Sequence, residues 1–124
     1  MIDASLAKAA DTSVPVSVMV VDESGVMKAF VRMDGAVLVS VETARNKAFA
    51  AAAIGMPPDD FYSAISSDGA AVASFGTRQG LALIAGGLPV LVDGQVAGAI
   101  GVAGAMTGAE DRAIAEAAVS RVSP

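Results

Sequence analysis

Residues 14–34 decide the fold, and they read VPVSVMVVDESGVMKAFVRMD. Two runs rich in β-branched residues, Val14–Asp22 and Val26–Asp34, stand on either side of Glu23-Ser24-Gly25. Such runs around a short turn that contains a glycine predict a β-hairpin. The first run is apolar on both faces, which predicts a central strand of a sheet.

The second run is expected to bury only one of its faces. Alternate residues of an extended strand point to opposite sides of the sheet. The predicted inward face comprises Met27, Ala29, Val31 and Met33, and the outward face comprises Lys28, Phe30, Arg32 and Asp34.

Further elements surround this hairpin. Helices are predicted over residues 2–11, from Ser40 as N-cap to a C-terminal stop at Gly55, over 58–66, and after a capping box at 107–110. Strands are predicted over residues 81–85, 89–92 and 95–102, and no element is predicted over 67–78. Together these elements predict an α+β fold, with a five-stranded antiparallel sheet flanked by helices. We expect residues 1–124 to form a single domain.

The chain is unusually apolar for its length of 124 residues: 54% of its residues are hydrophobic and 17% are charged, against about 25% charged on average. A membrane span does not explain this, because the longest apolar region, Leu81–Ala105, is interrupted by glycines, a proline and Asp93. The N-terminus has no signal-peptide pattern, so we expect a cytoplasmic protein. The apolar excess then predicts a homodimer or a higher homo-oligomer.

The composition also restricts the chemistry. The chain has no cysteine and no histidine, which excludes thiolate catalysis and the usual general base, and disfavours zinc and copper sites. A hard cation held weakly by carboxylates stays open. The net charge of −5 argues against nucleic-acid binding, which needs a cationic surface.

Lys47 is the first candidate for a functional site. At about 100° per residue, it shares a helical sector with Ala44, Ala48 and Ala51, the small residues expected to face the sheet. A lysine in this position extends its ammonium to solvent, forms a buried ion pair or points into a pocket. The sequence leaves these alternatives open.

Arg32 and Asp34 share a face at the end of the second predicted strand. They can pair with each other at the strand end. Alternatively, Arg32 can offer its forked guanidinium to an anionic ligand while Asp34 orients it.

Gly86-Gly87 and Glu42 complete the set of candidates. The two glycines form either a strained turn or a cradle of backbone N–H donors beside a pocket. Glu42 lies three and four residues before Arg45 and Asn46, which is typical of a surface pair on a helix.

Several motifs, in order along nearly the whole chain, resemble the GlcG/HbpS family, also called the haem-degrading domain family. The family includes the C-terminal domain of PduO-type cobalamin adenosyltransferases. The motifs are Val18–Asp22, Gly25, Arg32–Ala36, Ser40, Ala44–Ala48, Gly86–Pro89, Gly94–Gly104 and Asp111. The resemblance implies a profilin-like fold, assembly into homodimers or larger oligomers, and binding of haem or another small ligand.

The leading hypothesis is a cytoplasmic homo-oligomer that binds a small anionic metabolite of a catabolic pathway. Its ligand would contact Arg32, Asp34, Lys47 and the backbone of Gly86 and Gly87. No metal site is predicted. Because haem-ligating members of the family use histidine, its absence here disfavours haem as a cofactor.

Three alternatives remain. The same site can belong to an enzyme that hydrolyses, deaminates or isomerises an organic acid. Such an enzyme would use Lys47 with a lowered pKa, or a carboxylate with a raised pKa, the carboxylate candidates being Asp22, Asp34 and Glu42. The protein can bind haem through methionine, tyrosine or lysine, or it can be a structural subunit without a ligand.

Overall fold

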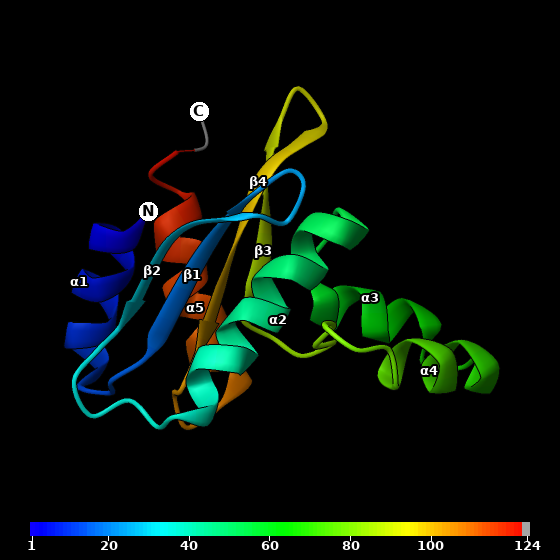
Figure 1. The fold of residues 1–124 in the computed structure, drawn as a ribbon, viewed down its shortest axis with the longest axis horizontal. Helices are drawn as coiled ribbons and strands as arrows, with labels where there is room; N and C mark the ends of the chain where they lie inside the picture. Colours follow the sequence, from blue (N-terminus) through cyan, green and yellow to red (C-terminus); the bar gives the residue numbers. More distant parts are fainter. Residues whose placement is uncertain (123–124) are drawn as a thin grey trace.

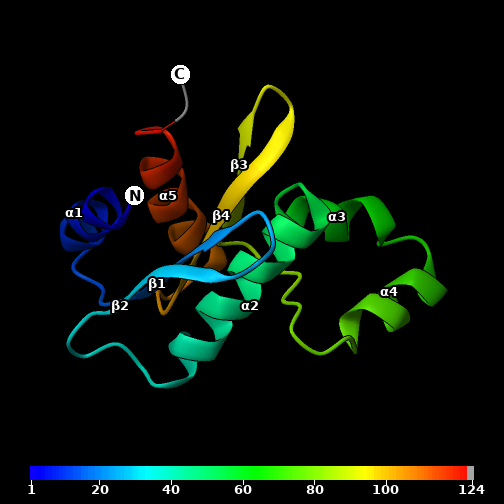
Figure 2. The same cartoon turned by 45° about the horizontal axis from the view of Figure 1, so that its top comes forward.

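A four-stranded antiparallel sheet with the strand order β2-β1-β4-β3 forms the centre of the computed structural model, which describes residues 1–122 (Figure 1). Helix α2 covers one face of the sheet, and α1 and α5 cover the other (Figure 2). The elements are α1 (Ile2–Thr12), β1 (Ser17–Asp22), β2 (Met27–Arg32), α2 (Val39–Ile54), α3 (Pro58–Ile65), α4 (Gly69–Gly76), β3 (Gly87–Val92), β4 (Gln95–Ala103) and α5 (Gly108–Val119). No helix among the described residues is long and apolar enough to cross a membrane.

The first hairpin is confirmed, and β1 is an inner strand between β2 and β4. Its turn is closed by the Asp22 carboxylate, which accepts the backbone N–H groups of Ser24 (2.8 Å) and Val26 (3.0 Å). Gly25 adopts φ +80°, and a Cβ there would lie 2.7 Å from the ring of Phe49. The turn therefore needs glycine both for its backbone conformation and for its contact with α2.

The predicted facing of Met27 is wrong, because β2 contains a bulge. Val20 pairs with Ala29, whereas the next residue of β1, Val21, pairs with Met27, so Lys28 is an extra residue in β2. One extra residue reverses the side of the sheet to which the preceding side chains point. Met27 therefore lies on the α2 side, where it is 59% exposed.

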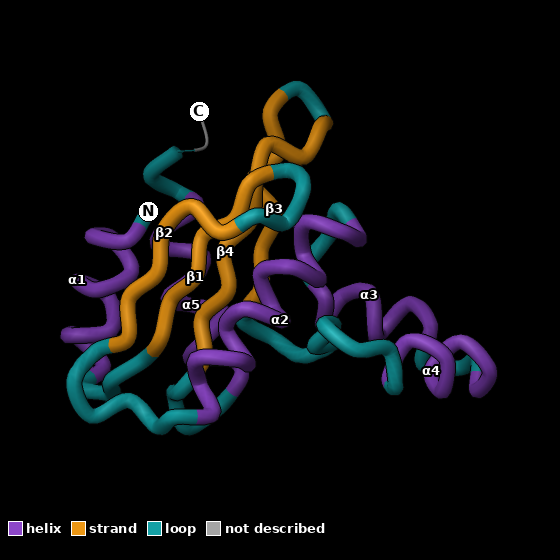
Figure 3. The backbone as a smooth tube through the Cα atoms, in the orientation of Figure 1, coloured by secondary structure: helices purple, strands orange, loops and turns teal. Residues whose placement is uncertain are grey.

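The sheet has four strands and not the predicted five, because residues 81–85 form no strand (Figure 3). Gly80 and Gly86 bound this segment, both with positive φ angles of +88° and +126°. Gly87 is already part of β3 and pairs with Gly101, so β3 begins two residues earlier than the predicted strand at 89–92. The finer expectation of a profilin-like fold stays a prediction.

The second hairpin and the last helix are confirmed. β3 and β4 pair antiparallel around Asp93-Gly94, whose φ angles of +53° and +79° are those of a tight hairpin turn. At the start of α5, the Thr107 hydroxyl accepts the N–H of Glu110 (3.2 Å) and donates to its carboxylate (3.1 Å). This is the reciprocal capping box that the sequence predicts.

Helix α2 lies unusually close to the sheet. The predicted stripe of Ala44, Ala48 and Ala51 is fully buried, and α2 ends at Gly55 in the left-handed conformation. A Cβ on Gly101 of β4 would overlap the Ala44 carbonyl oxygen and lie 2.5 Å from the Ala48 nitrogen. The helix backbone therefore rests directly on the strand backbone. The N-cap is Leu38 rather than Ser40, which is buried and shares a 2.8 Å hydrogen bond with Ser17 of β1.

Helices α3 and α4 form an arm that projects from the end of α2 (Figures 1 and 2). The sequence predicts α3 but not α4, which packs on α3 through an edge-to-face contact between Phe61 and Phe75, with ring centroids 5.1 Å apart. The Arg78 guanidinium lies 4.8 Å from the centre of the Phe75 ring. α4 contains no buried residue.

Candidate functional site

Lys47 forms a buried ion pair, one of the alternatives that the sequence left open. Its side chain is 2% exposed, and its Nζ donates to Asp111 Oδ2 and to the Val102 carbonyl oxygen, both at 2.9 Å. The other carboxylate oxygen of Asp111 accepts the Ala105 N–H at 3.0 Å. Lys47 belongs to α2 and Asp111 to α5, so the pair links the helices on opposite faces of the sheet.

Burial dominates the electrostatics of Asp111. Removal from water raises the pKa of this carboxyl above its usual 3.8, although the Lys47 ammonium and the Ala105 N–H act in the opposite direction. The first turn of α5 also favours a negative charge at this position. Since both partners are buried, loss of either one would leave an unpaired charge inside the protein.

Gly86 and Gly87 pass against this ion pair. A Cβ on Gly86 would lie 2.5 Å from the Val102 carbonyl oxygen and 2.7 Å from Lys47 Nζ, and one on Gly87 would lie 2.5 Å from the Lys47 carbonyl oxygen. The carbonyl of Gly86 accepts the N–H of Val102 at 2.9 Å. The structure thus brings together three of the predicted site residues, Lys47, Gly86 and Gly87. Close packing accounts for both glycines, and ligand binding by this group stays a prediction.

Arg32 and Asp34 lie apart from that group. Arg32 pairs across the sheet with Ser17, which pairs with Ala103, so two strand spacings separate Arg32 from β4. Its Nε and Nη2 donate to the Ala36 carbonyl oxygen at 3.1 and 2.8 Å. Within residues 1–122, no salt bridge joins Arg32 to the exposed Asp34. The turn that follows β2 orients the guanidinium in place of Asp34.

The remaining carboxylate candidates show no catalytic arrangement. Glu42 is exposed on α2, and the described part of the chain contains no salt bridge between it and Arg45. The N–H groups of Val26 and Ser24, together with Lys28, lower the pKa of Asp22 against a smaller effect of burial. That direction is opposite to the raised pKa that the enzyme alternative requires of Asp22.

A groove lies between β2 and α2, on the part of the sheet that α2 leaves uncovered. It has a volume of about 390 Å³ and is lined by Met19, Met27, Phe30, Val41 and Arg45. Met19 is 4% exposed and pairs across the sheet with Phe30. Four of the five lining side chains are apolar, and the fifth carries a positive charge.

Arg45 has neither a salt bridge nor a side-chain hydrogen bond to any described residue. It also lines an adjoining pocket of about 240 Å³, together with Gly25, Asn46, Phe49, Gln79 and Gly80. The sequence did not indicate that Arg45 lines these pockets, because Arg45 was assigned to a surface pair with Glu42. The signal that could have found it is the i,i+4 spacing of Val41 and Arg45, which places both on the side of α2 toward β2.

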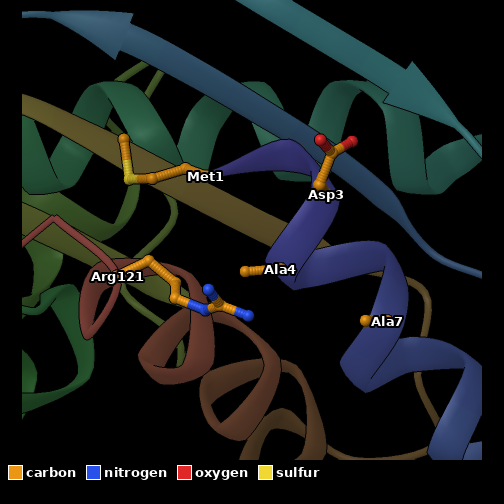
Figure 4. A pocket seen from close by; sticks show the side chains of 5 residues that line it. All are labelled: Met1, Asp3, Ala4, Ala7 and Arg121. Atoms are coloured by element: carbon orange, nitrogen blue, oxygen red, sulfur yellow. The ribbon is translucent and has the colours of Figure 1, made fainter.

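Figure 4 shows a further pocket, between the start of α1 and the chain that follows α5. Its volume is about 410 Å³, and Arg121 lies below Ala4 there while the Asp3 carboxylate points away from it. Met1 and Ala7 complete the lining. The opposite charges and the alanine wall favour no particular ligand. In the described residues, no three histidine, cysteine or acidic side chains gather in a way that could hold a metal ion.

Residues 1–120 match the family model "Haem degrading protein HbpS-like". The chain belongs to the HbpS-like family. Protein GlcG of Escherichia coli (strain K12) is 36% identical over 87 residues, which cover 70% of this chain and 63% of that protein. This confirms the resemblance to the GlcG/HbpS family.

Two solved structures extend the comparison. The crystal structure of a double mutant of Streptomyces reticuli HbpS is 31% identical, with a TM-score of 0.88 over 98% of this chain and 81% of that one. The PduOC:heme complex is 27% identical, with a TM-score of 0.86 over 96% and 86% of the two chains.

The motifs that carry the resemblance to the HbpS-like family meet in space. Lys47 lies in Ala44–Ala48, the glycine pair opens Gly86–Pro89, and Val102 lies in Gly94–Gly104. Lys47 binds both Val102 and Asp111. Gly86 packs against Lys47 and Val102. The groove beside Arg45 lies outside this meeting point.

Proposed function

We propose that this HbpS-like protein binds a small anionic molecule, and that it does so as a cytoplasmic homo-oligomer. The observation that carries the proposal is an arginine without a protein partner at the edge of an apolar groove. Arg45 supplies the charge, while Met19, Met27, Phe30 and Val41 supply the apolar walls. An arginine beside a concave apolar surface is a typical arrangement for orienting a bound anion.

The charge balance strengthens this argument. The chain carries a net charge of −5, which repels anions at long range, so an anion must be attracted by a local cation. Lys28, Lys47 and Arg112 each have a carboxylate within 4.0 Å. Arg45 has none among the described residues, and the same is true of Lys8, Arg32, Arg78 and Arg121. Arg45 differs from these four because it lines the apolar groove.

Arg32 is a second candidate contact, as the sequence predicts. It lies two residues beyond Phe30, so its side chain is on the same face of β2 as the groove. Two of its nitrogens bind the Ala36 carbonyl oxygen, and Nη1 makes no hydrogen bond within residues 1–122. For Lys47, Asp34 and the glycine pair, the contacts favour structural roles, and a ligand role stays a proposal.

Binding is better supported than catalysis. Among the described residues, Arg45 is the one ionisable residue that lines the groove, and a guanidinium neither gives nor takes a proton in ordinary conditions. Self-association is supported by three consecutive exposed apolar residues, Val37 (57%), Leu38 (72%) and Val39 (69%), next to the groove at the start of α2. An exposed apolar patch of this kind is typical of an interface.

The test is a binding screen by isothermal titration calorimetry with acetate, 4-methylpentanoate, benzoate, citrate and phosphate. We expect at least one carboxylate to bind the wild type, and Arg45→Gln to weaken that binding at least tenfold. Arg121→Gln, an exposed arginine at the other end of the molecule, is the matched control and should leave binding unchanged. Equal affinities for the wild type and Arg45→Gln would overturn the proposal.

Haem is the second candidate, because two thioethers line the groove. The HbpS-like family description and the PduOC:heme complex both name haem. Methionine sulfur is an axial ligand of haem iron in cytochromes c, where histidine is the other ligand. With no histidine in the chain, Met27 and Met19 would hold the iron and Arg45 a propionate. A Soret band with hemin that Met27→Leu shifts or abolishes would support this candidate. A band that Met27→Leu leaves unchanged would exclude Met27 as an iron ligand, and no Soret band in the wild type would exclude haem.

A further inference from the structure

Arg45 lies between two pockets of different chemistry. The groove on one side is apolar, with Met27, Phe30 and Val41 as its walls. The pocket on the other side, of about 240 Å³, is lined by Asn46 and Gln79, two residues whose side chains end in amides. Arg45 therefore lines both pockets, and a ligand bound to its guanidinium can extend in two directions.

The groove favours an aliphatic or aromatic side chain on the ligand. Met27 is 59% exposed and Phe30 is 37% exposed, although both are large and apolar. Covering them removes apolar surface from water, which strengthens binding by about 0.8 kcal/mol, or roughly fourfold, for each buried methylene. Because Met19 closes the floor of the groove, this gain ends once the ligand's side chain reaches it.

The adjoining pocket favours an amide group on the ligand. Asn46 is half-buried, and no described residue hydrogen-bonds to its side-chain amide or to that of Gln79. An amide offers both a donor and an acceptor, so its natural complement is another amide. Gly25, Phe49 and Gly80 complete the lining of this pocket, whose volume of about 240 Å³ is smaller than that of the groove.

We infer that the ligand is a carboxylic acid whose α-carbon carries both an apolar side chain and an acylamino group. This inference rests on the proposed anion site at Arg45. The carboxylate would pair with Arg45, the apolar side chain would enter the groove, and the amide would meet Asn46 and Gln79. N-acylated apolar amino acids have this chemistry, and so does the C-terminal residue of a peptide.

The experiment removes each of the three groups in turn from N-acetyl-L-leucine and measures affinity by calorimetry. The comparison compounds are 4-methylpentanoate, which lacks the acetamide, N-acetylglycine, which lacks the side chain, and N-acetyl-L-leucinamide, which lacks the charge. We expect each to bind at least fivefold more weakly than N-acetyl-L-leucine. Since three different contacts surround one carbon, the D-enantiomer should also bind at least fivefold more weakly.

Variants assign each group to its pocket. Asn46→Ala should remove the preference for N-acetyl-L-leucine over 4-methylpentanoate. Phe30→Ser should reduce the difference between N-acetyl-L-leucine and N-acetylglycine. Equal binding of 4-methylpentanoate and N-acetyl-L-leucine to the wild type overturns the inference but leaves the anion site standing, whereas no binding of any carboxylate overturns both.

A final arm of the experiment identifies the source of the ligand. A tetrapeptide that ends in leucine has the same three groups and a longer chain beyond the amide. If it binds as tightly as N-acetyl-L-leucine, the pocket is open to peptide C-termini. If it binds at least fivefold more weakly, the ligand is a free N-acylated amino acid.

Discussion

Lys47 and Asp111 are 64 residues apart in the chain and form a 2.9 Å ion pair that is almost completely withdrawn from solvent. The pair crosses the sheet where β3 begins, beside Gly86, and it joins the helical layers on the two faces. Its geometry explains why several motifs that are distant in sequence lie together in the fold.

Breaking this ion pair should destabilise the protein strongly. We expect Lys47→Met and Asp111→Leu to lower the free energy of unfolding by about 3–5 kcal/mol each, because each leaves a buried unpaired charge. The double variant should recover part of the loss. Urea denaturation measures these changes, and Lys28→Met is the control, because Lys28 is 63% exposed and its loss should cost less than about 1 kcal/mol. Additive single losses in the double variant would contradict the pairing.

The pH dependence of stability should separate two aspartates. Because the pKa of Asp111 is raised above 3.8, its contribution to stability is fully present below about pH 3.8 and decreases as pH rises through the folded pKa. The pKa of Asp22 is lowered, so its contribution is present above pH 3.8 and is lost as pH falls through the folded pKa. Carboxyl ¹³C NMR titration and denaturation of Asp111→Asn and Asp22→Asn measure these effects. Titration of Asp111 below Asp22 would refute the assignment.

Gly86 should tolerate alanine much less well than another glycine of positive φ. Gly86→Ala introduces both backbone strain and a collision with Val102 and Lys47, so we expect a loss of about 2–5 kcal/mol. Gly80→Ala is the matched control, because Gly80 has φ +88° but no atom within 4 Å of its added Cβ. Backbone strain alone should lower the free energy of unfolding of this variant by only about 1–2 kcal/mol. Similar losses for both variants would show that the contact with Lys47 contributes little.

The arm of α3 and α4 should depend on Arg112. This side chain on α5 binds Asp59 at 2.7 Å and Asp60 at 3.0 Å, and these carboxylates raise the pKa of its guanidinium. Arg112→Ala removes the contact between α5 and α3, so amide hydrogen exchange over residues 58–76 should accelerate while exchange in the sheet is unchanged. Arg121→Ala serves as the control. Unchanged exchange in the arm would mean that the Phe61–Phe75 contact and the junction with α2 suffice.

The exposed apolar residues before α2 should mediate self-association. Leu38→Asp places a charge on a side chain that is 72% exposed, so the folded subunit should tolerate it while an interface there should not. Light scattering after size-exclusion chromatography should give a larger mass for the wild type than for this variant. Tyr62→Asp, at an exposed position of α3, tests whether any exposed apolar residue has the same effect. A wild type that runs as a monomer would contradict self-association.

Elements that depend on local sequence could be predicted. The two hairpins follow from glycine-containing turns, the end of α2 from Gly55, and the start of α5 from the capping box at Thr107. In each case the interactions that define the element lie within a few residues of chain. The α+β class follows because the strands come in antiparallel hairpins, with helices before, between and after them.

Features that depend on distant partners could not be predicted. The bulge at Lys28 exists in the pairing between β1 and β2, so the alternation of β2 alone misplaces Met27. Residues 81–85 have the composition of a strand but no strand to pair with. For Lys47 the sequence indicated burial but could not identify Asp111, and the isolation of Arg45 becomes visible only when every possible carboxylate partner has been placed.

The contact of α2 with β4 at Gly101 has a consequence for recognition. Because backbone meets backbone there, the distance between the helix and the sheet is fixed by van der Waals contact between two backbones rather than by adjustable side chains. Val41 and Arg45 are therefore held at a set height above Met19 and Phe30 before any ligand arrives. Such a preorganised site spends little conformational entropy on binding, so it should discriminate sharply between ligand shapes.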